Sequence, residues 1–191
     1  WSTHPSKTPY KNIYSLEPGS LYKFNIEGKI LKKFYDKPKK IFSLKHYFTQ
    51  KSKNIIISDR DVGVYLSGGI DSFIASKIIS KKLKKMKSFS VNYKDKIFDE
   101  KKKQIIAARA LKTDHYNIEF NREDFFENLL NASFYAEIPN TRFAHIPMYL
   151  LSKKARAKST PVIITGEGAD EFFLGYDVFL ENFIINNIKS V

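Results

Sequence analysis

Strand-sized apolar segments alternate with helical patterns from about residue 61 to the end of the chain. The apolar runs at residues 62–66, 88–92, 115–120 and 161–165 have the length of buried strands. The segments between and after them predict helices at residues 71–83, 98–111, 122–135 and 145–158, and a final helix from about Glu171. Strands that alternate with helices of about 10 to 15 residues predict an α/β fold, a doubly wound parallel sheet with helices on both faces.

The first 60 residues have a different pattern. Short segments predict three strands with turns between them, at residues 10–16, 20–26 and 29–35. Strands this short do not hold together in water without further partners, and the chain begins with Trp1 rather than methionine, so we expect a piece of a longer protein. A lysine-rich segment follows and predicts a linker with one short helix near residues 44–48. We therefore expect three parts, at residues 1–36, 37–60 and 61–191.

The composition fits an ordinary globular protein. Of the 191 residues, 42% are hydrophobic and 28% are charged. No apolar run approaches the roughly 18 residues that a membrane span needs, and the polar N-terminus has no secretory signal. Cysteine is absent, which excludes disulfides and thiolate metal sites within these residues. We expect a cytoplasmic protein without a membrane partner.

The net charge of +13 is the one compositional feature that could indicate a nucleic-acid partner. Only five of the 33 basic residues are arginine, the residue best suited to phosphates and base edges. The lysines are scattered, and their densest runs fit solvated helix faces and loops. We therefore expect no nucleic acid among the partners.

A glycine-rich loop with two serines follows the first predicted strand of the main domain. Residues 67–72 have the sequence SGGIDS and lie between a strand and a helix. Two glycines let backbone N–H groups approach a ligand closely, and the helix N-terminus adds a partial positive charge. Such a loop favours a phosphate chain, although neither a Walker loop nor a dinucleotide fingerprint is present. The alternative is a tight turn with Asp71 as a helix cap, which explains Ser-Gly-Gly alone equally well.

Acidic residues add a metal ion to this interpretation. A carboxylate such as Asp71 would repel phosphates unless a divalent cation lay between them. A second loop, residues 165–171 (TGEGADE), also follows a predicted strand and carries three carboxylates. Singly, these acids could be partners of a helix dipole. Ligands of open parallel sheets bind beyond the carboxyl ends of the strands, where strand order reverses. If the two strands are neighbours, both loops face one crevice, and Asp71 and Asp170 could share a magnesium ion.

Both loops resemble those of one enzyme family. Residues 67–72 resemble the pyrophosphate loop of the ATP pyrophosphatase superfamily, whose members cleave ATP between the α and β phosphates. Residues 166–171 resemble the second loop of the asparagine synthetase family, and further segments similar to that family are residues 88–91, 98–100 and 147–152. The resemblance covers residues 62–180, and residues 1–36 resemble the closing strands of the family's glutaminase domain. It implies a Rossmann-like fold of the adenine nucleotide alpha hydrolase type.

The resemblance also implies a function: ATP-dependent amidation of aspartate to asparagine through a β-aspartyl-AMP intermediate. The substrates would be ATP, aspartate and ammonia or glutamine, with Mg²⁺ as cofactor, and the full-length enzyme could form a homodimer. By resemblance, the adenosine contacts are Leu66, Val91, Thr165 and Gly166, and the contacts to pyrophosphate and its magnesium are Ser67, Gly68, Gly69, Asp71 and Ser72. Asp170 would share the magnesium, and Glu167 matches the acidic residue that serves formation of the intermediate.

The sequence departs from the family in a few places. Leu174 stands where the family usually has glycine, so we expect the crevice wall to differ, while Thr165 replaces a serine and keeps the hydroxyl. The cysteine nucleophile of the glutaminase domain and the family's C-terminal helical half are not within these residues. We therefore expect one nucleotide site and not an enzyme that makes asparagine by itself.

Other functions stay open. A β-lactam synthetase would adenylylate a carboxylate with a similar core and then use an internal amine in place of ammonia. A non-catalytic nucleotide-binding module would keep the loops without turnover, although Asp71, Glu167 and Asp170 are intact. A basic RNA-binding protein fits less well, because arginine and aromatic residues do not cluster.

Overall fold

A parallel four-stranded sheet forms the centre of the computed structural model, which describes residues 8–35, 43–83, 85–94, 99–137 and 142–188. The strands are β3 (Val62–Tyr65), β4 (Lys87–Tyr93), β5 (Asp114–Phe120) and β6 (Val162–Ile164). Their order is β5-β4-β3-β6, and every neighbouring pair is parallel. All four strands agree with the apolar runs in the sequence, as expected for strands buried on both faces.

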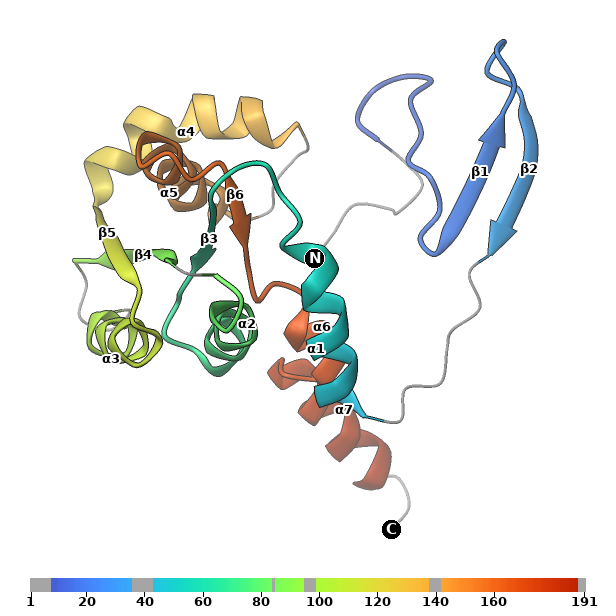
Figure 1. The fold of residues 1–191 in the computed structure, drawn as a ribbon. Coiled ribbons are helices and arrows are strands. Elements are labelled where there is room, and N and C mark those ends of the chain that lie inside the picture. The colour runs from blue at the N-terminus through green and yellow to red at the C-terminus, as the bar shows by residue number, and fades with distance from the viewer. Residues whose placement is uncertain (1–7, 36–42, 84, 95–98, 138–141, 189–191) are drawn as a thin grey trace.

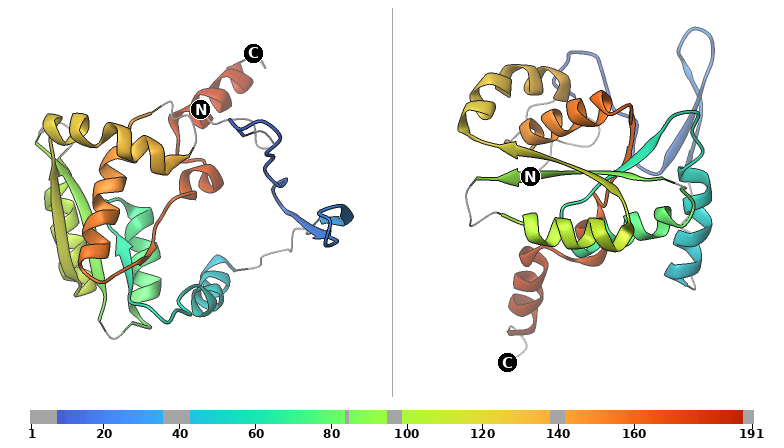
Figure 2. Two further views of the ribbon diagram at one scale, coloured as in Figure 1. Left: turned by 90° about the horizontal axis from the view of Figure 1, so that it is seen from above. Right: turned by 60° about the vertical axis from the view of Figure 1, so that its left-hand side comes forward.

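Helices cover both faces of this sheet (Figures 1 and 2). On one face, Val64 and Met86 belong to a buried cluster with residues of α2 (Ile70–Ser80) and α3 (Lys101–Leu111). On the other face, Phe89 packs against α5 (His145–Ala157), and α4 (Arg122–Ala136) lies against α5. The predicted doubly wound α/β fold is therefore confirmed.

Local sequence determines where the outer helices begin and end. The side chain of Asn121 accepts a hydrogen bond from Asp124 N at 2.9 Å, and Asp124 Oδ2 accepts one from Asn121 N at 3.0 Å. This reciprocal capping box satisfies two N–H groups at the start of α4. Helix α3 ends where Lys112 adopts a left-handed conformation, with φ of 53°.

Within the described residues, no helix has the length and apolar character needed to cross a membrane.

A separate hairpin precedes the sheet. β1 (Ser20–Phe24) and β2 (Ile30–Tyr35) pair antiparallel and stand away from the four-stranded sheet in both figures. The prediction of a further strand at residues 10–16 is wrong, since only Tyr14 forms an isolated bridge there. The chain instead turns, with Ile13 N donating to Tyr10 O at 3.3 Å. Asn12 makes this turn possible with a φ of 64°, a conformation that asparagine tolerates better than most residues.

Two helical predictions need correction. Helix α1 (Leu44–Ile55) is longer than the predicted one at residues 44–48, and Ser43 caps it by accepting from His46 N. The single final helix predicted from Glu171 is instead two helices, α6 (Ala169–Phe173) and α7 (Asp177–Ile188). Two further features, the predicted boundary between residues 36 and 37 and the predicted helix start at Phe98, lie outside the described residues.

The break between α6 and α7 is caused by the backbone of Leu174. This residue caps α6 with φ of 60° and ψ of 41°, in the left-handed region, and Gly175 N then donates to Asp170 O at 3.0 Å. Such a conformation costs a residue with a Cβ about 1 to 2 kcal/mol. Leu174 therefore differs from the glycine of the resembled family in backbone strain, and it does not line the cleft described below.

Replacing Leu174 by glycine should stabilise the protein by about 0.5 to 1 kcal/mol. Relief of the left-handed strain is partly offset by the greater chain entropy of glycine in the unfolded state. Urea denaturation of the purified protein measures the change. Leu180→Gly is the matched control, because Leu180 is also exposed but lies inside α7. That change should destabilise by about 1 kcal/mol, and a loss of stability in both variants would contradict the strain at Leu174.

Candidate active site

The strand order reverses between β3 and β6. Going along the chain, β4 and β5 are added on one side of β3, and β6 then pairs with its other side, in the register of Val64 with Ile164. Ligands of open α/β sheets bind beyond the carboxyl ends of strands at such a reversal. The loop after β3 and the loop after β6 leave the sheet there, side by side. The two strands that precede the loops are therefore neighbours, which was the condition for both loops to face one crevice.

The two loops touch each other through their backbones. A Cβ on Gly166 would lie 2.8 Å from Ser72 N and 3.0 Å from the carbonyl carbon of Asp71. Real Cβ atoms do not approach backbone atoms this closely, so the position requires glycine. Gly166 thus lets the second loop lie directly on the first turn of α2.

Hydrogen bonds fix the shape of the first loop. The hydroxyls of Ser67 and Ser72 lie 3.0 Å apart, and Gly69 N donates to Ser67 Oγ at 3.2 Å. Gly68 has φ of 90° and lies against α3, where an added Cβ would be 3.1 Å from Gln104 N. Gly69 is the N-cap of α2 and offers no side-chain hydrogen bond to it. The first N–H groups of α2 therefore lack a side-chain cap, the arrangement in which helix N-termini bind phosphate.

The second loop brings acidic side chains to the same place. Glu167 N donates to Thr165 Oγ1 at 3.4 Å, and Ala169 N donates to Gly166 O at 3.4 Å. Both Glu167 and Asp170 line the cleft. Glu171 accepts a hydrogen bond from Tyr176 OH at 2.9 Å and does not line it.

Tyr176 closes this acidic side of the cleft. Its hydrogen bond to Glu171 raises the pKa of the Tyr176 hydroxyl above 10.0, and burial and the negative charges of the nearby carboxylates act in the same direction. The one hydrogen of this hydroxyl is donated to Glu171.

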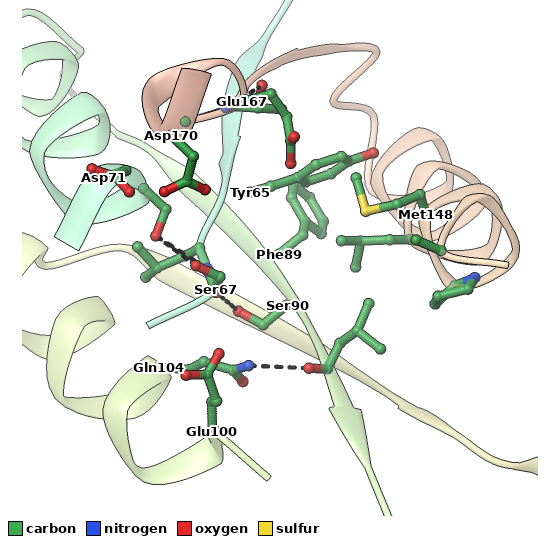
Figure 3. Close-up of a pocket in the computed structure, with 18 of the residues that line it drawn as sticks. Tyr65, Ser67, Asp71, Phe89, Ser90, Glu100, Gln104, Met148, Glu167 and Asp170 are labelled. Atoms are coloured by element: carbon green, nitrogen blue, oxygen red, sulfur yellow. Dashed lines mark hydrogen bonds between the residues drawn. The ribbon is translucent and has the colours of Figure 1, made fainter. Parts of the chain in front are cut away.

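The cleft has a volume of about 400 Å³ and two distinct sides (Figure 3). Its polar side is formed by the two loops and the first turn of α2. Its apolar side comes from strand β4 and helix α5, through Phe89, Val91, Pro147, Met148 and Leu151. A ligand with a flat apolar end and a phosphate end that carries a divalent cation matches this division.

Nearly all the site residues proposed from the sequence are found among the residues that line this cleft. The exceptions are Gly68 and Gly69, which lie in the first loop between the lining residues Ser67 and Asp71. The structure adds lining residues that the sequence did not single out, among them Phe89, Ser90, Gln104, Met148 and Tyr176. Some lie in segments 88–91 and 147–152, whose similarity to the family was a usable signal. Gln104 lies in no such segment.

Magnesium fits the residues present when it arrives with phosphate. Asp71 and Asp170 both line the cleft and lie at the same end of it in Figure 3. Across the described part of the chain, no group of three or more His, Cys, Asp or Glu residues could hold a metal ion. Magnesium commonly takes one or two carboxylates and completes its shell with water and substrate phosphates. Two carboxylates beside a phosphate cradle suit that mode.

Comparison with known proteins identifies a family that matches most of this chain. Residues 43–189 match the family described as asparagine synthase. The human asparagine synthetase (glutamine-hydrolyzing) is 32% identical over 165 residues, covering 76% of this chain and 29% of that protein. Asparagine synthetase (glutamine-hydrolyzing) 1 of Bacillus subtilis strain 168 is 29% identical over 180 residues, covering 89% of this chain and 28% of that protein.

These two relatives are much longer than the chain, which spans 28 to 29% of their length. Among solved structures, NMN synthetase from Francisella tularensis aligns with a TM-score of 0.49 and 21% identity, over 71% of this chain and 59% of that one. The family match alone covers more than half of the residues. This chain belongs to the asparagine synthase family.

Proposed function

We propose that this chain binds ATP in the cleft and forms part of an enzyme that converts aspartate to asparagine through β-aspartyl-AMP. The observation that carries the proposal is the backbone contact of Gly166 with Ser72, because it joins a phosphate cradle and the carboxylate of Glu167 in one cleft. Membership of the asparagine synthase family supports the choice of reaction.

The two sides of the cleft suit the two ends of ATP. The adenosine would lie on the apolar side, near Leu66 and Val91, and the phosphates on residues 67–72 and the N-terminus of α2. Asp71 and Asp170 would hold Mg²⁺, which would neutralise the charge on the departing pyrophosphate when bound. Thr165 and Gly166 would then border the adenosine from the second loop.

The proposed reaction has two steps. A β-carboxylate oxygen of aspartate attacks the α-phosphorus of ATP, and the bond from that phosphorus to the bridging oxygen breaks, releasing pyrophosphate. Ammonia then attacks the β-carbonyl carbon, and AMP leaves with the original carboxylate oxygen. Glu167 would serve formation of the acyl-adenylate from the edge of the second loop. The ammonia would come from glutamine in a glutaminase domain to which residues 1–36 contribute strands.

Isotope labelling tests this route in the complete protein. Aspartate with ¹⁸O in both β-carboxylate oxygens, ATP, Mg²⁺ and ammonium should give AMP that carries one ¹⁸O, together with asparagine that keeps the other. Mass spectrometry of the products measures the label. Glutamate in place of aspartate is the control and should give no AMP. Unlabelled AMP, or ADP with phosphate, would contradict transfer of AMP to the carboxylate.

A further inference from the structure

A buried amide lies beside the apolar side of the cleft. Gln104, on α3, is only 2% exposed, and it lines the cleft. Its Nε2 donates a hydrogen bond to the backbone oxygen of Val91 at 3.0 Å (Figure 3). A backbone carbonyl can only accept, so this contact fixes which end of the amide faces Val91. The Oε1 atom faces away, shielded from solvent and without a partner among the described residues.

The surroundings hold this amide in place. Gly68 packs so closely on the backbone of Gln104 that an added Cβ would be 3.1 Å from Gln104 N. Ser90 donates from its buried hydroxyl to Leu66 O, the corresponding carbonyl at the end of β3. Buried side chains therefore fix the carbonyls at the ends of both central strands. Such a preorganised pair of groups loses little conformational freedom when a ligand binds.

We infer that the Gln104 amide and the Val91 carbonyl together recognise the amine-bearing edge of adenine, an inference that rests on the proposed binding of ATP. An amide nitrogen has two hydrogens and a carbonyl oxygen has two lone pairs, so one of each is left after their mutual bond. The two residues that carry this donor and this acceptor, 3.0 Å apart, both line the cleft beside its apolar side. Adenine offers the complementary pair, the N6 amine beside a ring nitrogen that accepts.

Guanine fits this pair poorly when it lies in the orientation that adenine takes. Its O6 is an acceptor where adenine has a donor, so the Val91 carbonyl would face another acceptor. Polar groups that a ligand leaves unpaired in a buried site reject it more strongly than a lost apolar contact does. The Gln104 amide thus makes the site selective between purine bases. The glycine-rich loop at residues 67–72 would contact only the phosphates, which ATP and GTP share.

Nucleotide binding to the complete protein tests this assignment. Titration calorimetry with Mg²⁺ should show that the wild type binds ATP at least tenfold more tightly than GTP. Gln104→Leu keeps the volume and removes the donor, and it should weaken ATP binding about tenfold while changing GTP binding little. Gln104→Met should behave in the same way if leucine perturbs folding, which thermal melting would reveal. Gln50→Leu, at an exposed position on α1, is the matched control and should bind both nucleotides as the wild type does.

Base analogues identify the partner of the amide. One of two analogues, 1-deaza-ATP or 7-deaza-ATP, each of which lacks one ring nitrogen, should bind the wild type about tenfold more weakly than ATP does. The same analogue should bind the Gln104→Leu variant as tightly as ATP does. Equal weakening of ATP and GTP in the Gln104 variants would overturn the inference and leave the residue a structural role. A wild type that binds neither nucleotide would overturn the proposed function itself.

Discussion

Replacing Glu167 by glutamine should lower aspartate-dependent pyrophosphate release more than tenfold, a loss of at least about 1.4 kcal/mol of transition-state stabilisation. Glu167 lines the cleft, and its N–H bonds to Thr165 Oγ1, so the side chain enters the site from a fixed backbone. Glutamine keeps the shape and removes the charge. ATP binding should change much less, because the phosphates are proposed to lie on the other loop. Pyrophosphate release and ATP affinity are measured separately on the complete protein.

Glu171→Gln is the control for this change. It removes a carboxylate from the same short segment, but Glu171 bonds to Tyr176 OH and lies outside the cleft lining. Turnover in this variant should stay within about twofold of wild type. A Glu167→Gln enzyme with wild-type turnover would show that Glu167 only interacts with the helix dipole of α6, the bland explanation for acids at a helix start.

The positions of the strands and of both loops could be predicted from sequence for a physical reason. Strands buried on two faces are short, apolar and bounded by polar segments, so their pattern differs from that of the amphipathic helices between them. A tight loop between a strand and a helix needs glycine at fixed places, as Gly68 illustrates in residues 67–72 with its φ of 90°. The pairing of β6 with β3 was different, because strand order depends on contacts distant in the chain. From the sequence, this pairing could be stated only as the condition under which both loops face one crevice. In the structure, Val64 of β3 pairs with Ile164 of β6.

Two kinds of feature could not be predicted from the sequence: unusual backbone conformations and the roles of isolated polar residues. Leucine disfavours the left-handed region, so Leu174 itself gave no sign that a helix ends there, and Gly175 beside it was the one signal of a helix end. A single glutamine within a helical pattern is most often solvent-exposed, so Gln104 carried no sign that it reaches the Val91 carbonyl. Apart from Val91, the residues on the apolar side of the cleft, such as Phe89 and Met148, were not singled out as site residues, because a core side chain and a pocket-lining side chain look alike in sequence.

The contact between the loops should make Gly166 the least replaceable residue of the cleft. In Gly166→Ala the new methyl group would lie 2.8 Å from Ser72 N and 3.1 Å from Ser72 Cα, and both are backbone atoms of the helix that carries the phosphate cradle. Neither can move without shifting the first turn of α2, so the second loop must move away. We expect ATP affinity to fall at least tenfold, about 1.4 kcal/mol, and unfolding stability to fall by about 1 to 3 kcal/mol.

Gly28→Ala separates this clash from the general effect of replacing a glycine. Gly28 lies in the β1–β2 turn with φ of 79° and has nothing within 4 Å of an added Cβ. That change should cost about 1 kcal/mol of stability through backbone strain alone, and ATP affinity should stay as in the wild type. Denaturant unfolding and calorimetric titration of both variants give the comparison. If Gly166→Ala binds ATP as tightly as Gly28→Ala does, direct contact between the two loops is not needed for ATP binding.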